Sequence, residues 1–104
     1  MRITFDKEYL KDLYEKGVAD KKHRFQPEIV RKYVKVINIM KNASRIEDLL
    51  PIASLNYKVL TGDKDGIESV RVNDKFRIEF QATVIDAEVR ITVCNILELS
   101  NHYK

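Results

Sequence analysis

The 104-residue chain has a single cysteine, and this scarcity excludes several classes of protein. Cys94 cannot form an internal disulfide, which favours a reducing compartment. No Cys/His pairs have the spacing of a zinc site, and residues 62–66 match neither a phosphate-binding nor a calcium-binding loop, so we expect no metal and no cofactor. The first seven residues carry three charges, unlike a signal peptide, and no apolar run is long enough to span a membrane. These absences predict a cytoplasmic protein with no membrane partner.

The net charge of +3 is unevenly distributed along the chain. Residues 1–56 hold 12 Lys/Arg and 8 Asp/Glu, whereas residues 57–104 hold 7 and 8. The excess is densest in one stretch, which contains Lys21, Lys22, Arg24, Arg31, Lys32 and Lys35. Such a stretch can bind a phosphate backbone, and it can equally be an ordinary solvated face. The pattern favours nucleic acid without excluding the second interpretation.

A strand and a helix are predicted at the start of the chain. Residues 1–5 alternate between apolar and polar side chains, as in a short strand. Asp6 suits a helix N-cap, and Tyr9, Leu10, Leu13 and Tyr14 form one helical stripe. Gly17 is a plausible end of that helix.

A longer helix and a short helical piece follow a basic connector. Pro27 fits the first turn of the second helix, whose apolar residues recur at helical spacing to about Lys41. Ser44 and Glu47 have the spacing of a capping box, so residues 45–50 are expected to form one short helical piece.

The C-terminal half has the pattern of consecutive strands. Residues 67–73 are rich in β-forming side chains, and residues 76–84 and 89–97 alternate between apolar and polar. Asn73-Asp74 and Asp86 mark tight turns between them. Short turns between consecutive strands favour an antiparallel meander.

Together these elements predict a single α+β domain over residues 1–104. We expect an antiparallel β-sheet, made of the N-terminal strand and the C-terminal meander, with two helices packed on one face. The other face then presents the polar alternate residues, including Arg77, as a surface for RNA. Arg77 could instead form a cross-strand ion pair with Glu88 or a neighbouring acid. Tyr57 could stack on a base, or belong to the edge of the core.

Residues 101–104 end the chain with an amide, an imidazole, a phenol and a cation, in the order Asn101, His102, Tyr103 and Lys104. Imidazole and phenol groups can transfer protons, and Lys attracts phosphate. A last strand locked into the sheet would hold this tail at the sheet edge. The alternative is a disordered polar terminus. His23 is read as a surface residue, so an imidazole acid or base would fall to His102.

Residues 57–80, YKVLTGDKDGIESVRVNDKFRIEF, resemble the bacterial toxins of the RelE/ParE superfamily, and most of all its HigB-like branch. Those toxins have a similar L-x-G-D-x-x-G turn, a β-hairpin, and an arginine followed by alternating apolar residues. Residues 14–17 and the helix after Pro27 also fit, so the resemblance covers essentially the whole chain.

The resemblance implies a small RelE-like fold and a ribosome-dependent endoribonuclease that cuts mRNA without a metal. The ribose 2′-oxygen would attack the adjacent phosphorus, leaving a 2′,3′-cyclic phosphate and a 5′-hydroxyl. The implied partners are the ribosome, mRNA and a helix-turn-helix, HigA-like antitoxin. Operator DNA would be contacted only through that antitoxin.

The resemblance also assigns roles to residues. Arg77 matches the family's arginine and would stabilise transition-state charge, while Asn101, His102 and Tyr103 stand where the family usually has Asp, Tyr and His. Lys58 falls where a histidine is common. Lys64 and Lys104 join the basic stretch above as implied RNA and ribosome contacts.

Two departures from the family pattern leave alternatives open. Asn101 cannot take a proton, and Thr61 stands where the family often has a catalytic lysine. His102 could then be the base, with Lys58 or Lys64 supplying the missing cation. The alternatives are a ParE-like toxin that binds DNA gyrase without nuclease chemistry, and a catalytically impaired relative that only binds its antitoxin.

Overall fold

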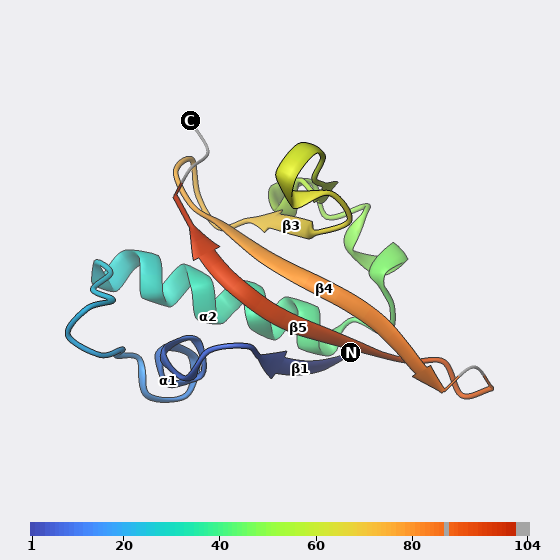
Figure 1. The fold of residues 1–104 in the computed structure, drawn as a ribbon, viewed down its shortest axis with the longest axis horizontal. Coiled ribbons are helices and arrows are strands. Elements are labelled where there is room, and N and C mark those ends of the chain that lie inside the picture. The colour runs from blue at the N-terminus through green and yellow to red at the C-terminus, as the bar shows by residue number, and fades with distance from the viewer. Residues whose placement is uncertain (87, 102–104) are drawn as a thin grey trace.

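The computed structural model describes residues 1–86 and 88–101. Its five-stranded sheet has the order β1-β5-β4-β3-β2. In chain order the strands are β1 (Arg2–Phe5), β2 (Lys58–Val59), β3 (Glu68–Arg71), β4 (Arg77–Asp86) and β5 (Ile91–Ser100). The helices are α1 (Glu8–Lys16) and α2 (Pro27–Asn42), with 3₁₀ turns η1 (Ile46–Leu49), η2 (Ala53–Leu55) and η3 (Gly62–Lys64). Figure 1 shows β4 and β5 crossing in front of α2.

The expected α+β architecture is confirmed, but the sheet is mixed rather than wholly antiparallel. Strands β2 to β5 form an antiparallel meander, whereas β1 pairs in parallel with β5. Two helices separate β1 from the meander, and no hairpin fixes its direction. The meander also has one more strand than expected. Strand β2 covers only two residues, which is too short for an alternating pattern.

The apolar stripe of α2 and one face of the sheet form the core. The fully buried residues include Tyr33, Ile37 and Met40 of α2 and Ile78, Phe80 and Ile96 of the sheet. The hydroxyl of Tyr33 donates to the carbonyl of Leu10 at 2.8 Å, which ties α2 to α1. Burial raises the pKa of this hydroxyl above its ordinary value of 10.0, so it keeps its proton further into the alkaline range.

Two helix starts differ from the sequence prediction. The N-cap of α1 is Lys7, because the N–H of Asp6 still donates to the Ile96 carbonyl in the sheet. The N–H groups of Ser44 and Arg45 both donate to the Asp48 carboxylate, so the predicted Ser44 and Glu47 capping box is wrong. The first turn of η1 begins one residue later than expected, with Arg45 as its N-cap.

The predicted end of α1 and the predicted start of α2 are both confirmed. Gly17 ends α1 with a left-handed backbone at φ 76°, a conformation that glycine adopts without strain. Pro27 occupies the first turn of α2, where its missing N–H has no helical acceptor to lose. Among the described residues, no helix is long and apolar enough to cross a membrane.

Cys94 is fully buried, and burial raises the pKa of its thiol from 9.0 to about 11. Because the thiol pKa is higher in the folded than in the unfolded protein, its contribution to stability is fully present at a pH below the unfolded pKa. This contribution is lost as the pH rises from about 9 to about 11. We expect the free energy of unfolding to fall by about 2 kcal/mol more in the native protein than in Cys94→Ala over this interval. Urea unfolding at several pH values measures the difference. Parallel curves for the two proteins would contradict the prediction.

Candidate functional site

The candidate site lies on the sheet face that points away from α2. Along β4, Ile78 and Phe80 point into the core, so Arg77 and Glu79 point to the opposite face. This face carries an unusual number of buried polar side chains, namely Ser69, Arg77, Glu79 and Ser100. The register places Arg77 opposite Ser100, and Glu79 opposite Ser69. The buried polar residues are therefore direct neighbours on the sheet.

Arg77 is the centre of this cluster and is only 5% exposed. Its Nε donates to Ser69 Oγ at 2.9 Å, and its Nη2 donates to the Ser69 carbonyl at 3.2 Å and to the Asn56 carbonyl. The side chain therefore lies under the segment that leads into β2, rather than on an open polar face as expected. The proposed ion pair with Glu88 is wrong, because Arg77 pairs with the end of β5 while Glu88 follows the far end of β4.

Lys64 and Glu79 form a second, partly buried link between the same segment and the sheet. Lys64 Nζ lies 2.7 Å from Glu79 Oε2, and the Glu79 side chain is only 5% exposed. The turn η3, which starts at Gly62 with φ 72°, brings Lys64 over β4. This confirms that residues 62–66 form a turn before a strand. The charge of Lys64 is largely offset by Glu79.

Lys58 lies at the outer edge of the site. It is exposed in β2 and stands opposite Ser69, the residue that binds Arg77. Thr61 is exposed at the N-cap of η3 and provides no charge. Lys58 and Lys64 therefore flank the buried cluster. Lys58 is the better placed of the two to meet an anion, since Lys64 is held by Glu79.

The C-terminal tail continues from the strand end that adjoins Arg77. Ser100 pairs with Arg77, and Asn101 follows it as an exposed residue. The predicted residues His102, Tyr103 and Lys104 lie outside the described residues. The register fixes the point at which the tail leaves the sheet, one residue beyond the partner of Arg77.

Tyr57 belongs to the edge of the core, as one of the two predictions had it. Its ring packs on Phe80, with 6.5 Å between ring centroids, and its hydroxyl donates to Glu68 Oε1 at 2.5 Å. Burial and this hydrogen bond raise the pKa of Tyr57. Glu68 also accepts the backbone N–H of Ala82. The Tyr57 ring thus packs on Phe80 while its hydroxyl is bonded to Glu68, and both contacts disfavour stacking on a base.

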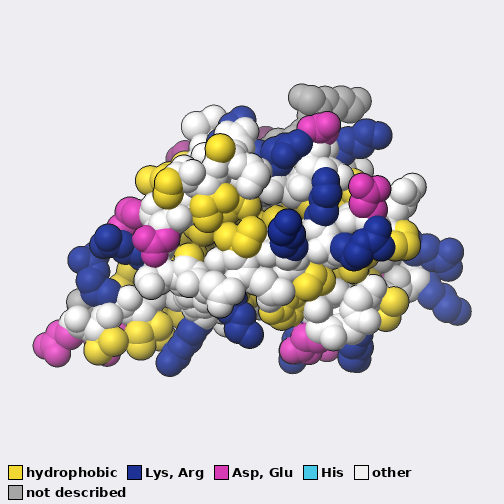
Figure 2. Space-filling model, turned by 180° about the vertical axis from the view of Figure 1, so that it is seen from behind, with side chains coloured by type: hydrophobic (Ala, Val, Ile, Leu, Met, Phe, Trp, Pro, Cys, Tyr) yellow, Lys and Arg dark blue, Asp and Glu magenta, His cyan; other side chains and the backbone are white. Residues whose placement is uncertain are grey.

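The predicted basic stretch does not share a surface with the buried polar cluster around Arg77. Lys21, Lys22, Arg24, Arg31, Lys32 and Lys35 are all exposed, but they lie on the α1–α2 connector and on α2, on the far side of the sheet from Arg77. Figure 2 looks at this face and shows Lys and Arg side chains with hydrophobic surface between them. The structure therefore separates a buried polar site from a basic helical face.

Sequence reasoning missed three residues of the site, Ser69, Glu79 and Ser100. Each lies on the polar side of a strand, and such positions are usually solvated. The signal was present only in part: Glu79 is two residues from Arg77, so alternation places both on one face. The segment from Asn56 to Lys64 covers this face of the sheet. The alternating pattern of the strands does not reveal that cover. The described residues hold no cluster of three or more His, Cys, Asp or Glu that could bind a metal ion.

Solved toxins share this fold at low sequence identity. A YoeB/ParE toxin from Agrobacterium tumefaciens aligns with a TM-score of 0.58 at 19% identity, covering 99% of this chain and 100% of that one. YafQ from E. coli strain BL21(DE3) aligns with a TM-score of 0.59 at 12% identity, covering 98% and 94%. A YoeB–YefM complex from Staphylococcus aureus gives 0.55 at 20% identity, covering 99% and 98%. These likenesses establish the fold.

The family of the chain is shown by its sequence. Residues 3–94 match the family model of the HigB-like toxins, described as RelE-like toxins of the type II toxin–antitoxin system HigB, so the chain belongs to this family. No curated protein sequence matches the chain. Membership confirms the family resemblance seen in the sequence.

Replacing Ser69 by Ala should destabilise the protein by about 1–3 kcal/mol, because it removes the acceptor of a buried guanidinium N–H. Urea unfolding monitored by circular dichroism measures this change. Ser44→Ala is the matched control, since Ser44 is exposed, and its effect should stay within about 0.5 kcal/mol. Equal stabilities of the two variants would show that the Ser69 hydroxyl contributes little.

Proposed function

We propose that this chain is the toxin of a type II toxin–antitoxin system and that it cuts ribosome-bound mRNA without a metal. The observation that carries the proposal is the position of Arg77. This preorganised cation lies beside Ser100, at the strand end from which Asn101, His102 and Tyr103 continue. Membership of a family of RelE-like toxins supports the same conclusion.

The reaction needs a base for the 2′-hydroxyl, an acid for the 5′-oxygen and positive charge near the phosphorane. In this proposal His102 removes the 2′-hydroxyl proton and Tyr103 protonates the leaving 5′-oxygen. The products are a 2′,3′-cyclic phosphate and a 5′-hydroxyl, so no water is consumed in the cut. Well-placed acid–base groups of this kind contribute about 10²–10⁴-fold to a rate.

Arg77 and Lys58 would stabilise the negative charge of the transition state. The hydrogen bonds of Arg77 to Ser69 and Asn56 fix its guanidinium before substrate arrives, which is how a cation contributes about 10²–10³ to a rate. Lys58 replaces the cation that Thr61 cannot supply, because it is exposed and adjoins Ser69 across the strands. Asn101 would orient rather than transfer protons, since an amide does not titrate.

The test maps mRNA ends in a bacterial translation extract with the purified chain. We expect new 5′-hydroxyl ends at defined codon positions, and their loss by about 10²–10⁴-fold in a His102→Ala/Tyr103→Phe variant. Lys11→Ala, an exposed change on α1, is the control and should cut normally. Substitution of Arg77 is a poorer test, because it would also release the segment that Arg77 holds.

Two results would overturn this proposal. The first is an absence of cuts with folded protein, and the second is full cutting by the double variant. A gyrase supercoiling assay on the same preparation identifies the alternative. Inhibition of supercoiling without mRNA cleavage would assign the chain to ParE-like, gyrase-binding toxins, and inactivity in both assays to an impaired relative.

A further inference from the structure

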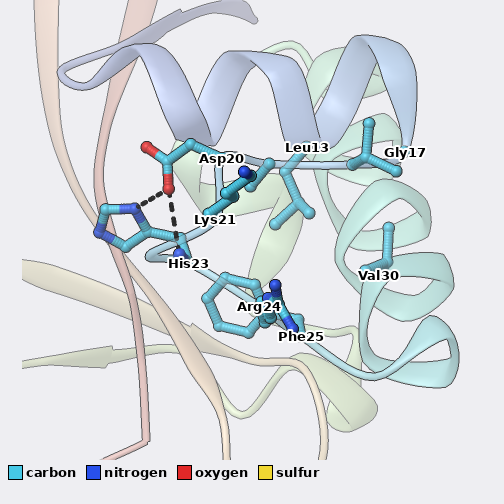
Figure 3. A pocket seen from close by; sticks show the side chains of 10 residues that line it. Leu13, Gly17, Asp20, Lys21, His23, Arg24, Phe25 and Val30 are labelled. Carbon is cyan, nitrogen blue, oxygen red and sulfur yellow. Dashed lines mark hydrogen bonds and ion pairs between the residues drawn. The ribbon is translucent and has the colours of Figure 1, made fainter.

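The Lys64–Glu79 pair differs from the other ion pairs formed within residues 1–86 and 88–101. The others join residues two to four positions apart. Figure 3 shows one of this local kind, on the wall of a pocket between α1 and α2, where the exposed Asp20 carboxylate binds the ring and the backbone N–H of His23. Lys64 and Glu79 are instead 15 positions apart, on different segments. The fold, rather than the local sequence, therefore brings them together.

Glu79 lies among the groups that surround the cation of the proposed nuclease site. It follows Arg77 by two residues on the same face of β4, about 6.6 Å along the strand. Ser69, which accepts the Arg77 Nε–H, stands directly opposite Glu79 on β3. Glu98 stands opposite Glu79 on β5. Two carboxylates therefore lie near the cation that the proposed reaction needs.

Arg77 and Glu79 are close enough on β4 to form a salt bridge, and a carboxylate binds a guanidinium strongly. In the structure, however, Arg77 donates to Ser69 and to the Asn56 carbonyl, and Glu79 Oε2 lies 2.7 Å from Lys64 Nζ. The Glu79 side chain is only 5% exposed, so loss of its ammonium partner would leave a poorly compensated buried charge. Arg77 is the one cation on the same strand, and it would then attract Glu79.

We infer that Lys64 is a positioning residue that keeps Glu79 away from Arg77. The ammonium binds the carboxylate, so the guanidinium retains its hydrogen bonds to Ser69 and Asn56. A guanidinium paired with a neighbouring carboxylate would stabilise a transition-state anion less. Lys64 thus acts on the reaction through Glu79 and not by touching the substrate. The effect on mRNA cleavage rests on the function proposed above.

The turn η3 holds Lys64 in the position that this role requires. The backbone N–H of Asp65 donates to the Gly62 carbonyl at 3.1 Å, and that of Ile67 donates to the Lys64 carbonyl at 3.0 Å. These bonds fix the backbone on both sides of the lysine just before β3 begins. The Lys64 side chain is 40% exposed, because it reaches from the turn across to β4.

A double-mutant cycle tests the inference in the mRNA-cleavage assay. Lys64→Met removes the charge but keeps the length of the side chain, and Glu79→Gln removes the carboxylate with little change of shape. We expect Lys64→Met to cut at least about tenfold more slowly than the native chain, approaching the 10²–10³-fold loss typical of a preorganised stabiliser. The Lys64→Met/Glu79→Gln variant should recover at least about tenfold of the lost rate, because the competing carboxylate is gone.

The cycle separates positioning from a direct action of Lys64 on the substrate. A double variant as slow as Lys64→Met would mean that the lysine acts directly, and would overturn the inference, as would native cleavage by Lys64→Met. Lys64→Arg keeps the charge and should cut faster than Lys64→Met. Lys11→Met makes the same chemical change at an exposed position of α1 and should cut normally. Circular dichroism checks folding, and Lys64→Gln replaces Lys64→Met in the cycle if the methionine variant does not fold.

The Nε–H resonance of Arg77 gives a second measurement, which does not depend on cleavage. Arg77 is the one buried arginine in the described part of the chain, so slow exchange with water identifies its Nε–H in ¹⁵N spectra. We expect this resonance to shift in Lys64→Met, where Glu79 competes with Ser69, and to return toward its native position in the double variant. An unchanged resonance in folded Lys64→Met would contradict the inference. If the native chain cuts no mRNA, the proposed function fails, but this measurement still decides whether Lys64 keeps Glu79 from Arg77.

Discussion

The hydrogen bonds of the buried Arg77 guanidinium hold the rest of the proposed site in place. They join strand β3, through Ser69, to the irregular segment that begins at Asn56. A buried guanidinium without acceptors would be strongly destabilising, so the covering segment and the arginine require each other. The Lys64–Glu79 pair fastens the same segment a few residues later. The exposed Lys58 lies between these two fixed points, and its position follows from them.

This arrangement gives the two sides of one sheet different chemistry. On one side, apolar alternate residues pack against α2, and on the other, polar residues are buried under a short segment instead of facing water. The basic residues of α2 then lie across the core from Arg77.

Much of the fold could be predicted from sequence because alternation and helical spacing report which side of an element is buried. Pro27, Gly17 and the alternation of residues 76–84 placed their elements correctly. The direction of β1 could not be predicted, since strand patterns carry no information on parallel or antiparallel pairing. The burial of Arg77 was missed because its acceptors, Ser69 and Asn56, are 8 and 21 positions away.

The pairing of β1 with β5 also constrains how the protein folds. Arg2 lies opposite Val93, 91 positions later in the chain, so closing this contact costs considerable chain entropy. The β3–β4–β5 meander involves only nearby residues and can form first, giving β1 an edge to dock on. Until β5 is in place, the strand end that leads to Asn101 has no position relative to Arg77. The arrangement proposed for the site therefore depends on the β4–β5 pairing and can form before β1 docks.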